Sequence, residues 1–157
     1  MADRSALRVR PRLIPYAGRD PRGATRVAVY RHLPRAMFSV RAIDGPDSGR
    51  VLAHSVRLGL RGAQMVVNER ARLKIAAGNP KDVHAWVTGT LAAVSLNDPV
   101  RITYRPCERG EFFVAETGQP IATAAAVAFL GTQVFIDAAE LVGGAVTEIR
   151  APGGTSR

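Results

Sequence analysis

Residues 37–60 read MFSVRAIDGPDSGRVLAHSVRLGL and contain two apolar runs on either side of a turn. In the first run Phe38, Val40 and Ala42 alternate with polar or flexible residues, the spacing that places alternate side chains on opposite faces of a β-strand. Residues 44–49, DGPDSG, are dense in turn formers. The second run, residues 51–60, is expected to place on one face Leu52, His54, Val56 and Leu58. This stretch therefore predicts an antiparallel hairpin with a longer loop.

The same period of two continues on both sides of the hairpin. Before it, Val27 and Val29 alternate with Ala28 and Tyr30. After it, further strands are predicted over residues 83–94, 100–104, 112–115, 121–129 and 134–136, with 112–115 pairing with 121–129. The predicted fold class is α+β, mainly an antiparallel β-sheet of seven or eight strands with one short helix and flexible termini.

The short helix is predicted over residues 69–77. Asn68 is a suitable cap, and Gly78-Asn79-Pro80 is a stop signal. A strand is the alternative, because Arg70, Arg72 and Lys74 alternate with apolar residues and would expose a basic ladder. The cap, the stop signal and the good helix formers favour the helix.

The chain of 157 residues fits one domain with tails. Residues 1–24 are rich in arginine and proline without apolar periodicity, so we predict a flexible basic arm there. Residues 25–142 would form the single β-rich domain, and residues 143–157 a flexible tail. Deleting the arm is then expected to leave thermal stability nearly unchanged.

The charge is lopsided. The first 41 residues hold ten arginines against Asp3 and Asp20, which gives +8 of the net charge of +9. Residues 110–149 hold five acidic residues and no Lys or Arg. An anionic partner at the basic end is the natural inference. The arginine bias, 20 of 22 basic residues, is also what a GC-rich genome produces.

Cysteine usage and apolar segments bear on the compartment. The single cysteine, Cys107, cannot form an intramolecular disulfide, which fits a reducing cytoplasm. The N-terminus has no apolar run, and residues 121–130 are too short to span a bilayer. We therefore expect a cytoplasmic protein without a membrane partner.

Signatures of enzymatic chemistry do not occur in the sequence. The histidines His32, His54 and His84 are spread over three predicted elements, without ligands at metal-binding spacing, so no metal or cofactor is expected. His54 is predicted to be a core histidine on an apolar face. Cys107 lacks a catalytic partner motif, and no phosphate loop or nucleophile elbow is visible. The protein is predicted not to be an enzyme.

Arginines and one aromatic residue remain as candidate ligand contacts. Candidate phosphate-binding residues on the first three strands are Arg31, Arg35, Arg41, Arg57 and Arg61. The alternation in residues 81–88 places Trp86 and His84 on one face, where they could stack a base. The alternative is that Trp86 anchors the core.

Several segments resemble a set of small phage proteins. The resemblance rests on YRHL and FSVR before the turn, VLAH after it, DVHAWVTG, YRP and FVAETGQPI, and it covers about residues 28–130. The chain departs from the pattern at Arg31, Asp82 and Arg105, where the pattern has Asn or a comparable polar residue. The resemblance implies a phage or prophage origin, and with it the host cell cytoplasm or the virion as the location, but no established activity.

The function expected from these features is binding of nucleic acid or a nucleotide by a non-enzymatic phage accessory protein. The alternative is a structural or protein-interaction role, such as a minor virion component. There the basic arm of one copy would meet the acidic C-terminal region of the next copy. Another phage or host protein is the alternative partner.

Overall fold

The computed structural model describes residues 5–21, 26–67, 85–104 and 112–141. Within these ranges the chain forms twelve strands and one 3-10 helix. The strands are β1 (Leu7–Val9), β2 (Ile14–Pro15), β3 (Val27–His32), β4 (Met37–Ala42), β5 (Val51–Ser55), β6 (Arg57–Val67), β7 (Ala85–Leu91), β8 (Val94–Leu96), β9 (Pro99–Thr103), β10 (Phe113–Val114), β11 (Thr123–Leu130) and β12 (Gln133–Asp137), and the helix is η2 (Ala138–Leu141).

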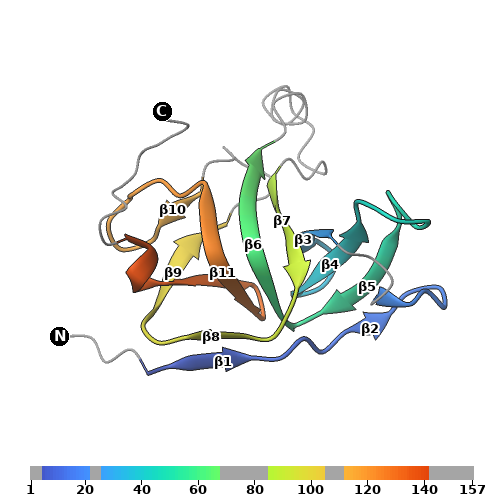
Figure 1. The fold of residues 1–157 in the computed structure, drawn as a ribbon, viewed down its shortest axis with the longest axis horizontal. Helices are drawn as coiled ribbons and strands as arrows, with labels where there is room; N and C mark the ends of the chain where they lie inside the picture. Colours follow the sequence, from blue (N-terminus) through green and yellow to red (C-terminus); the bar gives the residue numbers. More distant parts are fainter. Residues whose placement is uncertain (1–4, 22–25, 68–84, 105–111, 142–157) are drawn as a thin grey trace.

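Ten strands form one antiparallel sheet in the order β10-β9-β12-β11-β6-β7-β3-β4-β5-β2. The other two, β1 and β8, pair with each other and run side by side below the sheet in Figure 1. The long central strand β6 joins the two halves, since it pairs with β11 on one side and with β7 on the other. The prediction of a mainly antiparallel sheet is confirmed, and the described strands outnumber the predicted seven or eight.

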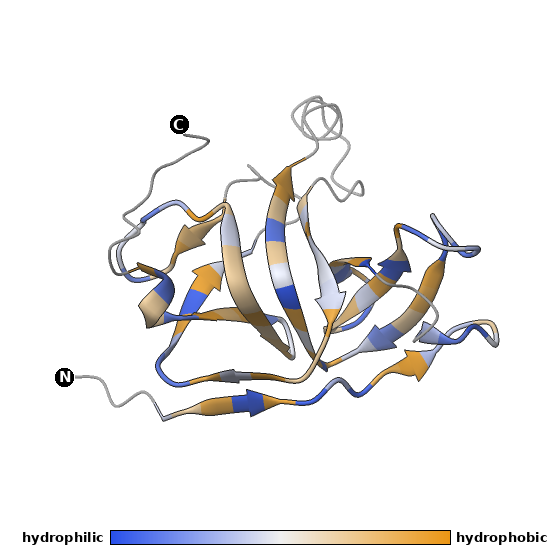
Figure 2. Ribbon diagram, viewed as in Figure 1, coloured by the Kyte–Doolittle hydropathy of each residue, from blue (hydrophilic) through white to orange (hydrophobic). Residues whose placement is uncertain are grey.

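The sheet bends over its own apolar face and encloses the main core. Phe38 of β4 and Phe129 of β11 are fully buried, and their ring centroids are 4.9 Å apart although several strands separate them in the sheet order. Tyr104, which follows β9, donates a hydrogen bond to the carbonyl of Ala85 in β7. Apolar and polar residues alternate along the strands in Figure 2, as the period of two predicts.

The predicted hairpin forms, but its second strand is shorter than predicted. β4 pairs with β5, which ends at Ser55, and the exposed Val56 lies at the corner before β6. The hydroxyl group of Ser55 accepts a hydrogen bond from the backbone N–H of Arg57 and lies 2.6 Å from the carbonyl oxygen of Arg12. The side chain thus satisfies backbone groups that a bend leaves without sheet partners.

A β-bulge in β5 changes the face of the sheet on which its side chains lie. The register shifts after Val40, which pairs with Ala53, while Arg41 pairs with Val51. Leu52 is therefore the extra residue and is buried in the core, whereas His54 pairs with Ser39 on the outer face of the sheet. The predictions that Leu52 and His54 share one apolar face and that His54 is a core residue are both wrong.

The N-terminal segment is part of the fold where the structure describes it. β1 pairs with β8 and buries Val9 against Val94, Leu96 and Ala128. β2 pairs with β5 at the far end of the large sheet. The prediction of a flexible arm over residues 1–24 is therefore wrong for residues 5–21, because two strands of three and two residues leave no readable period.

Two further predictions concern a strand pairing and segments that lie outside the described residues. β10 pairs with β9, and the segment that follows is joined to it by a bridge between Phe113 and Pro120 and by bonds from the N–H of Val114 to Gln119 and from the N–H of Ile121 to Phe112. The strand β11 pairs with β6 and β12 instead, so the predicted pairing of 112–115 with 121–129 is wrong beyond Ile121. The predicted helix over residues 69–77 and the tail over 143–157 lie outside the described residues. In the described ranges we find no helix that is long and apolar enough to cross a membrane.

A glycine in β6 allows β8 to lie close to the sheet. A Cβ atom on Gly59 would lie 2.6 Å from the carbonyl oxygen of Ala92 and 2.8 Å from a methyl group of Val94. We expect Gly59→Ala to lower the free energy of unfolding by roughly 1 to 3 kcal/mol. Chemical denaturation measures this loss, with Ser95→Ala at an exposed position of β8 as the control. Equal stability of Gly59→Ala and wild type would contradict this packing.

Candidate functional site

Trp86 lies on the outer face of the sheet beside Tyr30 and Arg41. Its neighbours in β7, Ala85 and Val87, are buried in the core, so alternation turns the partly exposed indole to the other side. β3 and β7 pair Val29 with Val87, and continuing this register brings Tyr30 opposite Trp86. Trp86 is therefore placed where a ligand can reach its ring.

Arg41 and Tyr30 hold each other on this face. The Arg41 guanidinium donates a hydrogen bond of 3.2 Å to the Tyr30 hydroxyl, and its central carbon lies 5.2 Å from the Tyr30 ring centroid. With Ala28, Ile43 and Trp86 these two side chains line a cavity of about 190 Å³. An aromatic wall beside a fixed guanidinium suits a flat ring that carries a negative group.

Two histidines meet in the next part of the outer face. The ring centroids of His32 in β3 and His54 in β5 are 4.4 Å apart. The Nδ1 atoms of His32 and His54 lie 3.4 and 3.2 Å from the hydroxyl oxygen of Ser39, which stands between them in β4. The ring of Tyr16 contacts that of His54 edge to face, with 5.4 Å between centroids.

The surroundings of His54 disfavour its charged form. Partial burial, then the neighbouring His32, then Arg35 lower the pKa of His54 below its usual value. Residues of the histidine pair and its surroundings line a cavity of about 340 Å³, and none of the described residues that line it is acidic. An anion placed there would meet no repelling carboxylate among them.

Tyr30 lines both cavities, so they form one continuous surface. We call it the aromatic-basic face and define it by Tyr16, Tyr30, His32, Arg41, His54 and Trp86. Five strands carry or adjoin these residues: β2, β3, β4, β5 and β7. The face therefore depends on the pairing of these strands rather than on any local motif.

The structure places the five candidate phosphate-binding arginines in two different regions. Arg41 lies on the aromatic-basic face, Arg35 lies in the β3–β4 turn close enough to affect His54, and Arg31 lines the edge of the histidine cavity. Arg31 pairs with Phe38 on the core-facing side of β3.

Arg57 and Arg61 lie elsewhere, along β6 where it pairs with β11. The Arg61 guanidinium donates to the carbonyl of Ala93. The predicted partner of Trp86, His84, is outside the described residues.

Sequence reasoning missed the histidine pair. His32 and His54 are 22 positions apart and lie in separate predicted elements. The available signal was the hairpin of β3 and β4, whose register pairs Tyr30 with Ser39 and so groups Tyr30, His32 and Ser39 on one side. The bulge at Leu52, which turns His54 to that side, has no sequence signature.

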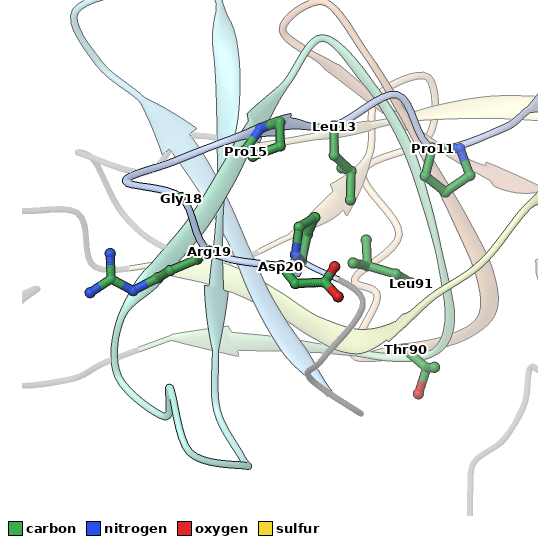
Figure 3. A pocket seen from close by; sticks show the side chains of 9 residues that line it. Pro11, Leu13, Pro15, Gly18, Arg19, Asp20, Thr90 and Leu91 are labelled. Atoms are coloured by element: carbon green, nitrogen blue, oxygen red, sulfur yellow. The ribbon is translucent and has the colours of Figure 1, made fainter.

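A larger cavity, of about 830 Å³, lies under the N-terminal segment (Figure 3). Its walls include Pro11, Leu13 and Pro15 from that segment and Leu91 from β7. Arg19, at its rim, forms an ion pair of 3.6 Å with Asp47. The apolar walls and the paired arginine make this cavity a poorer match for an anion than the aromatic-basic face.

In the described ranges, no three His, Cys, Asp or Glu side chains come together as metal ligands would. The histidine pair alone offers two ligands, fewer than structural and catalytic zinc sites use.

Comparison with known proteins gives a family and no activity. The chain is 35% identical over 103 residues to the "Gene 82 protein" of Mycobacterium phage L5, an alignment that covers 60% of this chain and 82% of that protein. No solved structure matches this chain. Residues 21–137, which include the whole aromatic-basic face except Tyr16, match the family described as Mycobacterium phage L5 gene 82 protein. The chain therefore belongs to this family of phage proteins.

Proposed function

We propose that this phage protein is a non-enzymatic accessory protein that binds single-stranded nucleic acid or a nucleotide on its aromatic-basic face, in the cytoplasm of the host cell. The observation that carries the proposal is the position of Trp86, partly exposed beside Tyr30 and Arg41 at a cavity on the outer face. A tryptophan that served only to fill the core would lie on the other face of β7, with Val87.

Base stacking and electrostatic attraction both favour such a ligand. Stacking of a base on an aromatic side chain is worth roughly 1 to 3 kcal/mol, and a guanidinium beside the ring can contact a phosphate. The net charge of +9 adds a long-range attraction for polyanions. Hydrogen bonding to a phenol leaves other N–H groups of Arg41 available, because a guanidinium has five.

A structural role in the virion is the second candidate, and the edge strand β2 favours it. β2 ends the large sheet, and Ile14 and Tyr16 beside its free edge are 56% and 49% exposed. Because β2 has two residues and one of them is Pro15, a contact with another chain there would rest on these exposed apolar side chains rather than on backbone pairing. The basic and acidic regions of two copies would add attraction. Large oligomers without affinity for nucleic acid would favour this candidate.

Substitutions on the face test the lead proposal. With fluorescently labelled oligo(dT), we expect Trp86→Ala to weaken binding by roughly 1 to 3 kcal/mol while thermal stability stays close to wild type. Trp86→Phe, which keeps an aromatic ring, should retain most of the affinity. Fluorescence anisotropy measures the binding and circular dichroism the stability.

Arginine variants separate a site from a diffuse charge effect. Arg41→Ala should weaken binding and reduce the slope of log affinity against log salt by about 0.7. Arg101→Ala is the matched control, because Arg101 is an exposed arginine of β9 that lines neither cavity of the aromatic-basic face. Equal losses in the two variants would mean that net charge, rather than this face, binds the oligonucleotide.

A further inference from the structure

The histidine pair shares one hydroxyl group, and this fixes where its protons lie. Both Nδ1 atoms face the oxygen of Ser39, whose side chain is 2% exposed. A hydroxyl group has one hydrogen to donate. It can donate to only one Nδ1, so the other ring must carry its proton on Nδ1 and donate to the Ser39 oxygen.

The two remaining ring nitrogens then differ. The ring that accepts at Nδ1 carries a hydrogen on Nε2, whereas the ring that donates at Nδ1 has a lone pair on Nε2. One further proton can bind to that lone pair without breaking either contact with Ser39. The pair would then present two N–H donors and one positive charge, which are the features that bind an oxyanion.

The charges around the histidine pair make the binding of this further proton depend on a bound anion. Tyr30 from β3, Arg35 from the following turn and Tyr16 after β2 surround the pair, Arg31 lines the edge of the same cavity, and no Asp or Glu is among the described lining residues. Without a ligand, a positive charge on the pair is opposed by partial burial and by Arg35. A bound dianion reverses that balance and favours protonation.

We propose that the His32–Ser39–His54 cavity is the phosphate subsite of the aromatic-basic face and takes the terminal phosphate of a nucleotide together with one proton from solvent. This inference rests on the proposed function, since the base would stack at Trp86 on the other side of Tyr30. The ligand is thus a phosphate monoester of a nucleoside or of an oligonucleotide end, rather than the internal phosphates of a strand alone.

The sign of the pH dependence follows from the bound proton. The complex holds the proton more tightly than the free pair, so the extra affinity is fully present below the pKa of the free pair. It is lost as pH rises through the pKa of the complex. Affinity should fall by up to about tenfold per pH unit in that window, which corresponds to one linked proton.

Calorimetry with adenosine 5′-monophosphate and adenosine tests this subsite. At pH 7.5 the free phosphate, whose second pKa is about 6, is already a dianion and takes up little proton itself. We expect the monophosphate to bind roughly tenfold or more tightly than adenosine. Titrations in two buffers of different ionisation enthalpy should show net uptake of up to one proton with the monophosphate and none with adenosine.

Three variants test whether the proton uptake and the preference for the monophosphate depend on the His32–Ser39–His54 cavity. His32→Gln, His54→Gln and Ser39→Ala should each abolish proton uptake and remove most of the preference for the monophosphate, while adenosine still quenches Trp86. Proton uptake by the wild-type protein needs no variant, so a variant that fails to fold does not block the test. Equal affinities of both ligands, or binding of the monophosphate without proton uptake, would overturn the subsite and leave the proposed function standing. Absence of binding by adenosine, the monophosphate and oligo(dT) would overturn both.

Discussion

Replacing Phe38 by alanine should lower the free energy of unfolding by roughly 3 to 5 kcal/mol, the range for a fully buried phenylalanine. The ring is 0% exposed and contacts Phe129 and Tyr104, at centroid distances of 4.9 and 5.8 Å. These partners come from parts of the sheet that are distant in strand order. The cavity would therefore open where the two halves of the sheet pack together, and urea denaturation measures the loss.

Leu33→Ala is the control for this prediction. Leu33 is close in sequence but 42% exposed, so its truncation should change stability by less than about 0.5 kcal/mol. If Phe38→Ala were as stable as Leu33→Ala, the two halves of the sheet could not be packed through this ring.

Deletion of residues 1–10 should also destabilise the protein, by roughly 3 kcal/mol. The deletion removes β1, including the buried Val9 and the partly buried Leu7, and exposes the apolar side of Leu96. Full burial of one such side chain is worth about 1.5 to 3 kcal/mol. Thermal and urea unfolding of the truncated and full-length chains gives the difference.

A point variant in the same strand checks the cause. Arg8→Ser changes an exposed position between Leu7 and Val9 and should leave stability almost unchanged. Val9→Ala should account for part of the loss. If the truncated protein unfolded like the full-length chain, residues 5–10 would act as the free arm that composition alone suggested.

The main sheet could be predicted where the alternation is long and regular. Val27 and Val29, and then Phe38, Val40 and Ala42, are all fully buried as their spacing indicates. The corner at Ser55 and the bulge at Leu52 could not be predicted, because both depend on backbone groups that find partners only in the folded sheet. β1 was missed for a similar reason, since its partner β8 lies far along the chain.

The candidate site shows the same division between features that local alternation predicts and features that depend on the folded sheet. The alternation of Trp86 with Ala85 and Val87 indicates a face for the ring, and the structure shows that this face is the outer one. The approach of His32 to His54 depends on the registers of two strand pairs and on a bulge, which no local pattern encodes. Arginine composition indicated an anion but not which arginines gather, because charge carries no information on register.

The fluorescence of Trp86, the single tryptophan of the chain, tests the central claim most directly. Because only this indole emits, stacking of a base on it should quench the signal saturably when oligo(dT) is added at low salt. The binding constant should then fall with salt, with a slope of about −0.7 per phosphate contacted. Binding detected by anisotropy without any change in tryptophan fluorescence, or no binding at low salt, would contradict the aromatic-basic face as the site of nucleic-acid binding.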